Sequence, residues 1–212
     1  MTLFWCDAVS SDKFRLASLS MVIAVILWIV VFLVHPFDFW IMLSASTFML
    51  LLISAMINRD SWRVEVSARL VAYGVLSAVL LYVFFYLGFQ VTKSNPMFSE
   101  GVSRVYELRS SQPAMMIGLM LVFPIGPGEE IYWRGLIQRR FAEKFGPRSG
   151  YLTATLAYAL VHLPTLNYPL ILTAFIGGLV WGYIYKVTGN LAPAVVSHII
   201  WDLLIFVIVP LS

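Results

Sequence analysis

The chain has 212 residues, of which 60% are hydrophobic and 12% charged, and its formal net charge is +3. A soluble domain of this size carries about twice this share of charged residues, so the composition predicts a polytopic membrane protein. The small net charge bears on topology and gives no reason to expect a nucleic-acid partner. The expected surroundings are the lipid bilayer.

Long apolar runs separated by short charged loops predict an all-α fold with about seven transmembrane helices. The first run follows Lys13 and Arg15 and is longer than a cleaved signal core, so we expect a retained signal anchor. Residues 92–112 are polar and mixed in charge, which indicates a loop with room for a short surface helix. The predicted spans are 16–34, 37–57, 70–91, 113–145, 150–163, 168–187 and 191–209.

The distribution of basic residues between these spans predicts the topology. Cytoplasmic loops of membrane proteins are enriched in Lys and Arg, so we expect the N-terminus in the cytoplasm and the C-terminus outside. No internal repeat or linker divides the chain, and residues 1–212 are expected to form one membrane domain. The basic residues on the predicted cytoplasmic side are Lys13, Arg15, Arg59, Arg63, Arg69, Arg139, Arg140, Lys144, Arg148 and Lys186.

Six ionisable residues lie inside the predicted spans, away from their ends. Such residues are costly in a bilayer and usually have a function. At the helical rise of about 1.5 Å per residue, the carboxylates and imidazoles among them lie roughly 12 to 21 Å from the cytoplasmic ends of three spans. Unrelated polar residues would not be expected to share one layer. The six are Glu129, Glu130, Arg134, His162, His198 and Asp202.

The spacing of these residues separates a structural pair from a candidate reactive group. Glu130 and Arg134 are four residues apart on one helical face, where an ion pair forms readily. Glu129 is turned by about 100° from Glu130, so it stays free of that pair. His198 and Asp202 repeat the four-residue spacing, and their plainest interpretation is an interhelical hydrogen-bonding pair.

Proline and glycine precede Glu129 in the fourth span. Pro124, Gly126, Pro127 and Gly128 either produce a simple kink or break the helix and create a new N-terminus beside Glu129. In the second case the free N–H groups there would favour a carboxylate or a developing oxyanion.

Three motifs in this order resemble the CPBP family of intramembrane glutamic endopeptidases, which includes the CAAX proteases and the bacteriocin-processing (Abi) proteins. The family pattern is Glu-Glu-x-x-x-Arg, then Phe-x-x-x-His, then His-x-x-x-Asn/Asp. Its counterparts here are Glu129-Glu130-x-x-x-Arg134, Tyr158-x-x-x-His162 and His198-x-x-x-Asp202. The resemblance covers residues 113–209, the expected catalytic core, and leaves residues 1–112 as three N-terminal spans and a polar loop.

The resemblance implies an endopeptidase without a metal or other cofactor that cleaves a membrane-associated peptide or protein. Glu129 and His162 would activate water, and His198 with Asp202 would stabilise the oxyanion. Two departures stand out: Tyr158 replaces Phe and adds a hydroxyl, and Asp202 stands where the best-studied members have Asn. An ionised Asp cannot donate a hydrogen bond, so we expect Asp202 to orient His198 as an acceptor.

Other functions remain open at this point. Glu129, His162, His198 and Asp202 are of types that bind zinc, although no His-Glu-x-x-His helix is present. A non-catalytic scaffold or bacteriocin-immunity protein could retain the same fold. A small transporter with a site at the broken helix is a further alternative, but the chain lacks two-fold internal symmetry. We expect the protein in the cell membrane, with a bacterial plasma membrane as the expected location.

Overall fold

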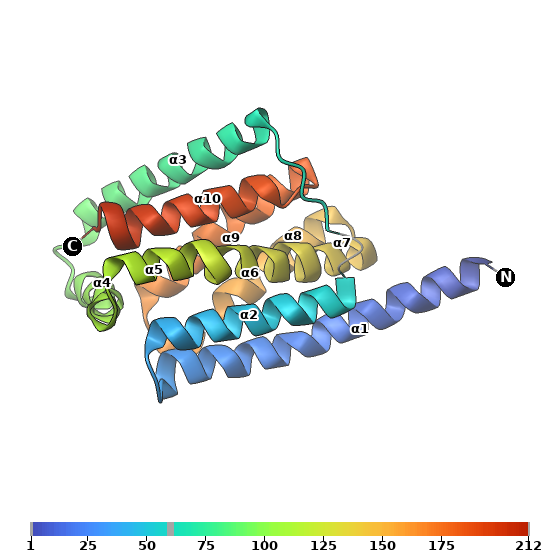
Figure 1. The fold of residues 1–212 in the computed structure, drawn as a ribbon, viewed down its shortest axis with the longest axis horizontal. Helices are drawn as coiled ribbons and strands as arrows, with labels where there is room; N and C mark the ends of the chain where they lie inside the picture. Colours follow the sequence, from blue (N-terminus) through green and yellow to red (C-terminus); the bar gives the residue numbers. More distant parts are fainter. Residues whose placement is uncertain (1, 59–61, 212) are drawn as a thin grey trace.

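The computed structural model describes residues 2–58 and 62–211. Within these ranges all secondary structure is helical, which confirms the predicted all-α fold. Most helices follow the long axis of the molecule, and the two ends of the chain lie at opposite ends of it (Figure 1). The α-helices are α1 (Thr2–Ile29), α2 (Phe39–Asn58), α3 (Ala68–Thr92), α4 (Pro96–Glu107), α5 (Ala114–Met120), α6 (Gly126–Glu130), α7 (Arg139–Phe145), α8 (Pro147–Leu160), α9 (Tyr168–Thr188) and α10 (Ala192–Leu203).

Tighter and wider helical turns extend several of these helices. The wider, π-helical turns are Val30–Val34, Leu121–Ile125, Ile131–Gln138 and Leu204–Ile208, and the 3-10 turns are Leu108–Ser111 and Leu163–Thr165. The turns before and after α6 join it to its neighbours α5 and α7, so that the fourth predicted span continues from Ala114 to Phe145.

Five helical segments of the described chain are long and apolar enough to cross a membrane, which makes this a multi-pass membrane protein. They correspond to five of the predicted spans: Asp12–Val34, Phe39–Asn58, Ala68–Thr92, Ala114–Phe145 and Tyr168–Thr188. The two remaining predicted spans are shorter helices, namely the apolar segment Ala192–Ile208 and the 14-residue α8. Of the basic residues used to predict topology, Arg59 lies outside the described residues.

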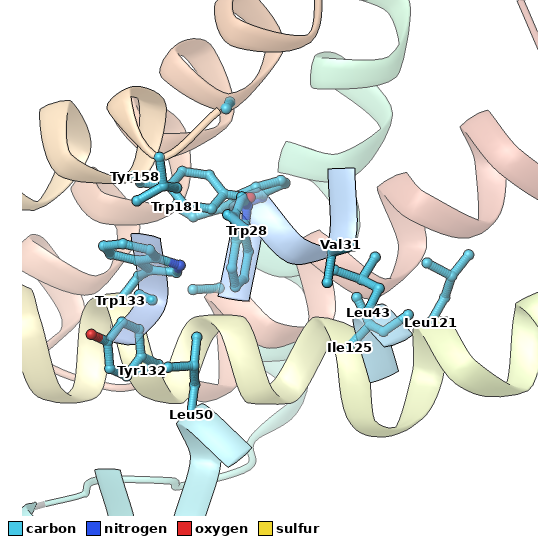
Figure 2. Close-up of a cluster of buried hydrophobic side chains, with 14 of the residues drawn as sticks. Trp28, Val31, Leu43, Leu50, Leu121, Ile125, Tyr132, Trp133, Tyr158 and Trp181 are labelled. Carbon is cyan, nitrogen blue, oxygen red and sulfur yellow. The ribbon is translucent and has the colours of Figure 1, made fainter. Parts of the chain in front are cut away.

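Close helix packing at glycines holds the bundle together. The helices α3 and α10 meet at Gly74, where an added Cβ would come within 2.7 Å of Val196 Cγ1. At Gly178, the helices α8 and α9 approach so closely that a Cβ would lie 3.2 Å from Thr155 Cγ2. The space between the helices is filled by large aromatic and aliphatic side chains, several of which gather in one buried cluster (Figure 2).

The helix α4 forms within the segment predicted as a polar loop. It begins with an N-cap, since the Asn95 side chain accepts a hydrogen bond from Met97 N at 3.0 Å, and Pro96 occupies its first turn. Asn167 fixes the helix to the start of α9, because its Nδ2 donates to Gly101 O at 2.9 Å. Figure 1 shows α4 crossing the end of the bundle near the C-terminus.

Candidate functional site

The fourth predicted span is broken shortly before Glu129. Phe123 has an extended backbone conformation (φ −160°, ψ 118°), and its bond to Pro124 is cis. Proline lacks an N–H and disfavours the helical conformation at the residue before it, which places the break at Phe123–Pro124, the first of the prolines and glycines in this stretch. Gly126 N–H donates to Leu121 O across the break, so this N–H already has a partner within the helix.

A close contact of α6 with α2 brings both glutamates into the interior. A Cβ added to Gly128 would lie 2.9 Å from Thr47 O, so a side chain at this position would push the two helices apart. The residues that follow it are almost completely buried, with Glu129 6% and Glu130 0% exposed. Because position 128 is a glycine, α6 can approach α2 closely enough for both carboxylates to be buried.

Glu130 is the acceptor in a three-residue ionic cluster. Its Oε1 accepts a hydrogen bond from Arg134 Nη1 at 2.9 Å and lies 2.8 Å from His198 Nδ1. All three side chains are buried. A carboxylate paired with arginine only accepts hydrogen bonds, so His198 Nδ1 carries a proton. The contact joins α6 to α10, which the spacing within one helix could not predict.

His198 is held by an aromatic stack on its ring and by Glu130 at Nδ1. Trp181 stacks on the imidazole with ring centroids 3.8 Å apart and an interplanar angle of 15°. Asp202 Oδ2 lies 3.6 Å from His198 Nε2, an ion-pair distance that is too long for a hydrogen bond. Glu130, and not Asp202, therefore makes the hydrogen bond that orients His198. The other ring nitrogen of His198, Nε2, lies near Asp202 without a hydrogen bond to it.

The two oxygens of Glu129 have different surroundings. The Tyr158 hydroxyl donates a hydrogen bond to Glu129 Oε2 at 2.8 Å. Oε1 makes no hydrogen bond to any residue in the described part of the chain. One oxygen is thus held by the protein while the other is available to a water molecule or a substrate.

His162 uses both of its ring nitrogens within the protein. Nδ1 lies 2.9 Å from the backbone carbonyl of Tyr158, which only accepts, so Nδ1 is protonated. Trp28 Nε1, which only donates, lies 3.0 Å from His162 Nε2, so this nitrogen is the acceptor. The two contacts hold a neutral imidazole of one tautomer. No hydrogen bond between His162 and Glu129 occurs in residues 2–58 and 62–211.

A cavity of about 280 Å³ brings the candidate residues together. Glu129, Tyr158, His162, His198 and Asp202 all line it, whereas Glu130 and Arg134 lie outside its lining. The rest of the lining is mostly apolar and includes residues of α2, α3, α4, α9 and α10. Its aromatic members besides Tyr158 are Phe32, Phe39, Trp40, Phe84, Phe85, Phe89, Phe98, Tyr106, Trp181, Trp201 and Phe206.

Three aromatic residues at the site were not predicted as functional. Trp28, Tyr158 and Trp181 belong to the buried cluster of Figure 2, and each contacts at least one of the ionisable residues. Only Tyr158 had a signal in the sequence, because it replaces the Phe of the motif and precedes His162 by four residues. Trp28 and Trp181 could not be distinguished from the other tryptophans of an aromatic-rich membrane protein.

Comparison with known proteins agrees with the motif pattern. Residues 110–204 match the model of a protein family described as type II CAAX prenyl endopeptidase Rce1-like. The matched segment contains Glu129, His162, His198 and Asp202, and it leaves out α1 and therefore Trp28. No curated protein and no solved structure matches the chain.

Proposed function

Residues 110–204 match the Rce1-like family of type II CAAX prenyl endopeptidases, and from this match we propose that the chain is an intramembrane endopeptidase with Glu129 as its general base. The observation that carries the proposal is the asymmetry of Glu129. Oε2 is held by Tyr158, while Oε1 has no partner in the described chain and Glu129 lines the cavity. A base needs one such oxygen within reach of water.

In the proposed reaction, Glu129 takes a proton from a water molecule as the water oxygen bonds to the carbonyl carbon of the scissile peptide. The same proton then passes from Glu129 to the leaving amine as the C–N bond breaks. His162 assists in its neutral form by exchanging the Trp28 N–H for a water O–H at Nε2. Neither step needs an oxidant or a reductant. Glu129 accepts one proton and gives it up again, so it ends the reaction as the carboxylate it was at the start.

His198 is the proposed donor to the developing oxyanion. Its Nδ1–H is used by Glu130, so it donates from Nε2 as an imidazolium, and Asp202 at 3.6 Å stabilises that charge. A positively charged donor in a site that excludes water stabilises an oxyanion strongly. Asp202 contributes through His198 in this scheme, and it needs no proton of its own.

The proposed substrate is a peptide or protein at the membrane that is cut near its cytoplasmic end. The N-terminus would be cytoplasmic and the C-terminus outside, in agreement with the opposite placement of the two ends in Figure 1 and with the predicted basic loops. We further propose that residues 1–212 act as one membrane domain around a catalytic core at 113–209, in a bacterial plasma membrane.

Comparison of protein termini in the host membrane tests the proposal. In cells with the wild-type protein and in cells with Glu129→Gln at equal abundance, at least one membrane peptide should be processed only by the wild type. That peptide would identify the substrate. If every terminus is the same in both cells, and the biological effect of the protein is retained, the chain is a scaffold or immunity protein instead.

Metal removal should leave the activity unchanged. Among the described residues, no group of three or more His, Cys, Asp or Glu side chains is placed to hold a metal ion, and zinc at His162 Nε2 would first have to displace the Trp28 N–H. Cleavage by the purified protein should therefore be equal before and after exhaustive dialysis against a chelator, with metal content followed by mass spectrometry. Activity that disappears with the metal and returns with added zinc would favour the zinc protease.

A further inference from the structure

Tyr158 contacts three of the ionisable residues at the site. Its hydroxyl donates to Glu129 Oε2 at 2.8 Å, and its backbone carbonyl lies 2.9 Å from His162 Nδ1. The guanidinium carbon of Arg134 lies 4.9 Å from the centroid of its ring, which is a cation–π distance. The side chain is 6% exposed and lines the cavity.

The position of the Tyr158 ring is determined by helix packing and not by Glu129. Gly178 on α9 lies opposite, and a Cβ added there would come within 3.4 Å of Tyr158 Cδ1. The ring also packs against Trp133, with centroids 5.4 Å apart. A hydroxyl on a ring held in this way is a fixed donor, so it determines the rotamer of the flexible glutamate side chain.

The hydroxyl also affects the charge of Glu129. A hydrogen bond donated to a carboxylate stabilises the charged form over the protonated acid. In an apolar cavity such a donor offsets part of the free energy that burial of the charged carboxylate costs. Phe, which the family motif has at this position, would offer Glu129 neither of these effects.

We propose that Tyr158 is a positioning residue for Glu129. Its hydroxyl holds Glu129 Oε2, so that Oε1 of the ionised carboxylate faces the cavity and a water molecule there. The inference rests on the proposed role of Glu129 as the base, and it goes further by assigning a function to the atom that distinguishes this chain from the motif. Tyr158 acts through Glu129 and takes no part in bond formation.

Labelling with dicyclohexylcarbodiimide tests this without any substrate, because the reagent is apolar and reacts with protonated carboxyl groups. Tyr158→Phe should raise the labelling rate of Glu129 at neutral pH by about tenfold, as the loss of a hydrogen bond to a charged group predicts. The rate is measured on the intact protein in detergent, with the modified residue located by peptide mass spectrometry.

Tyr132→Phe is the matched control. It removes the same atom from a tyrosine that is 0% exposed, but its hydroxyl lies 3.0 Å from Ser20 Oγ and contacts no ionisable residue at the site. Its labelling rate should stay within about twofold of the wild type, since nothing that contacts Glu129 changes. Equal rates in the wild type, Tyr158→Phe and Tyr132→Phe would overturn the proposal.

Two non-natural residues at position 158 separate the hydrogen bond from packing. 4-Aminophenylalanine retains a donor at the ring tip, and 4-methylphenylalanine has a similar size without one. The first should restore the wild-type labelling rate, and the second should behave like Tyr158→Phe even if that variant folds poorly. On an identified substrate, the donor-free variants should lose kcat by about tenfold, with KM within about twofold, because the lost contact orients the base.

The outcome also distinguishes this inference from the proposed function. If Glu129 is labelled fast in the donor-free variants but Glu129→Gln processes peptides normally, the effect of Tyr158 on Glu129 is supported and the proposed peptidase function is contradicted. Loss of processing in Glu129→Gln, combined with equal labelling rates, would retain the peptidase and reject the role of Tyr158.

Discussion

Glutamine in place of Glu129 should lower the rate constant for peptide cleavage by about two to four orders of magnitude, which is the contribution expected of a general base. The substitution keeps the size of the side chain and an oxygen that accepts the hydrogen bond from Tyr158. What it removes is the ability to take a proton from water. The measurement is cleavage by the purified protein in liposomes, with thermal unfolding recorded on the same samples.

Glu65→Gln is the control for this loss of one carboxylate. Glu65 forms a surface ion pair with Arg63 at 3.0 Å, and its side chain is 64% exposed. Both variants should unfold at nearly the wild-type temperature, but only Glu129→Gln should be inactive. A Glu129→Gln protein that cleaves at more than half the wild-type rate would show that the base is another group.

Arg134→Gln should be the most destabilising single substitution at the site. The guanidinium lies 2.9 Å from Glu130 Oε1, with side-chain exposures of 2% and 0%, and it also lies over the rings of Tyr158 and Trp181. Removing it leaves buried Glu130 with His198 as its remaining partner in the cluster, and losing one member of a buried ion pair costs about 3–5 kcal/mol. Thermal unfolding in detergent and resistance to proteolysis measure the effect.

The double variant Glu130→Gln/Arg134→Gln should recover part of this stability, because it also removes the buried charge. Arg104→Gln is the matched control: it breaks the pair with Glu100, at 3.6 Å, in which both side chains are about two-thirds exposed. A surface pair of this kind contributes about 0–1 kcal/mol. Equal stability of Arg134→Gln and Arg104→Gln would contradict a stabilising role for the buried pair.

The helical character of the chain and its candidate residues could be predicted from the sequence because both depend on local patterns. An apolar run of sufficient length forms a helix in a bilayer whatever its neighbours are, since its backbone has no other hydrogen-bond partners. The spacing of four residues likewise predicts that Glu130 and Arg134 share a helical face. The match of residues 110–204 to a protease family agrees with the order of the three motifs.

The residues that surround each of these groups could not be predicted, because they come from other helices. Trp28 is separated by 134 positions from His162, to which it donates, and His198 by 68 from Glu130. Which side chains meet depends on the rotation and axial position of each helix. These are determined by close contacts such as that of Gly128 with Thr47 O.

The sequence by itself therefore determined that this protein is helical, lies in a membrane and carries the motifs of a protease. The tertiary structure decided that the helix breaks at Phe123, that Glu130 orients His198, and that Tyr158 leaves one oxygen of Glu129 free. The physical reason is the range of the interactions. Hydropathy and helical spacing act within one segment, whereas the state of a buried carboxylate depends on every helix packed around it.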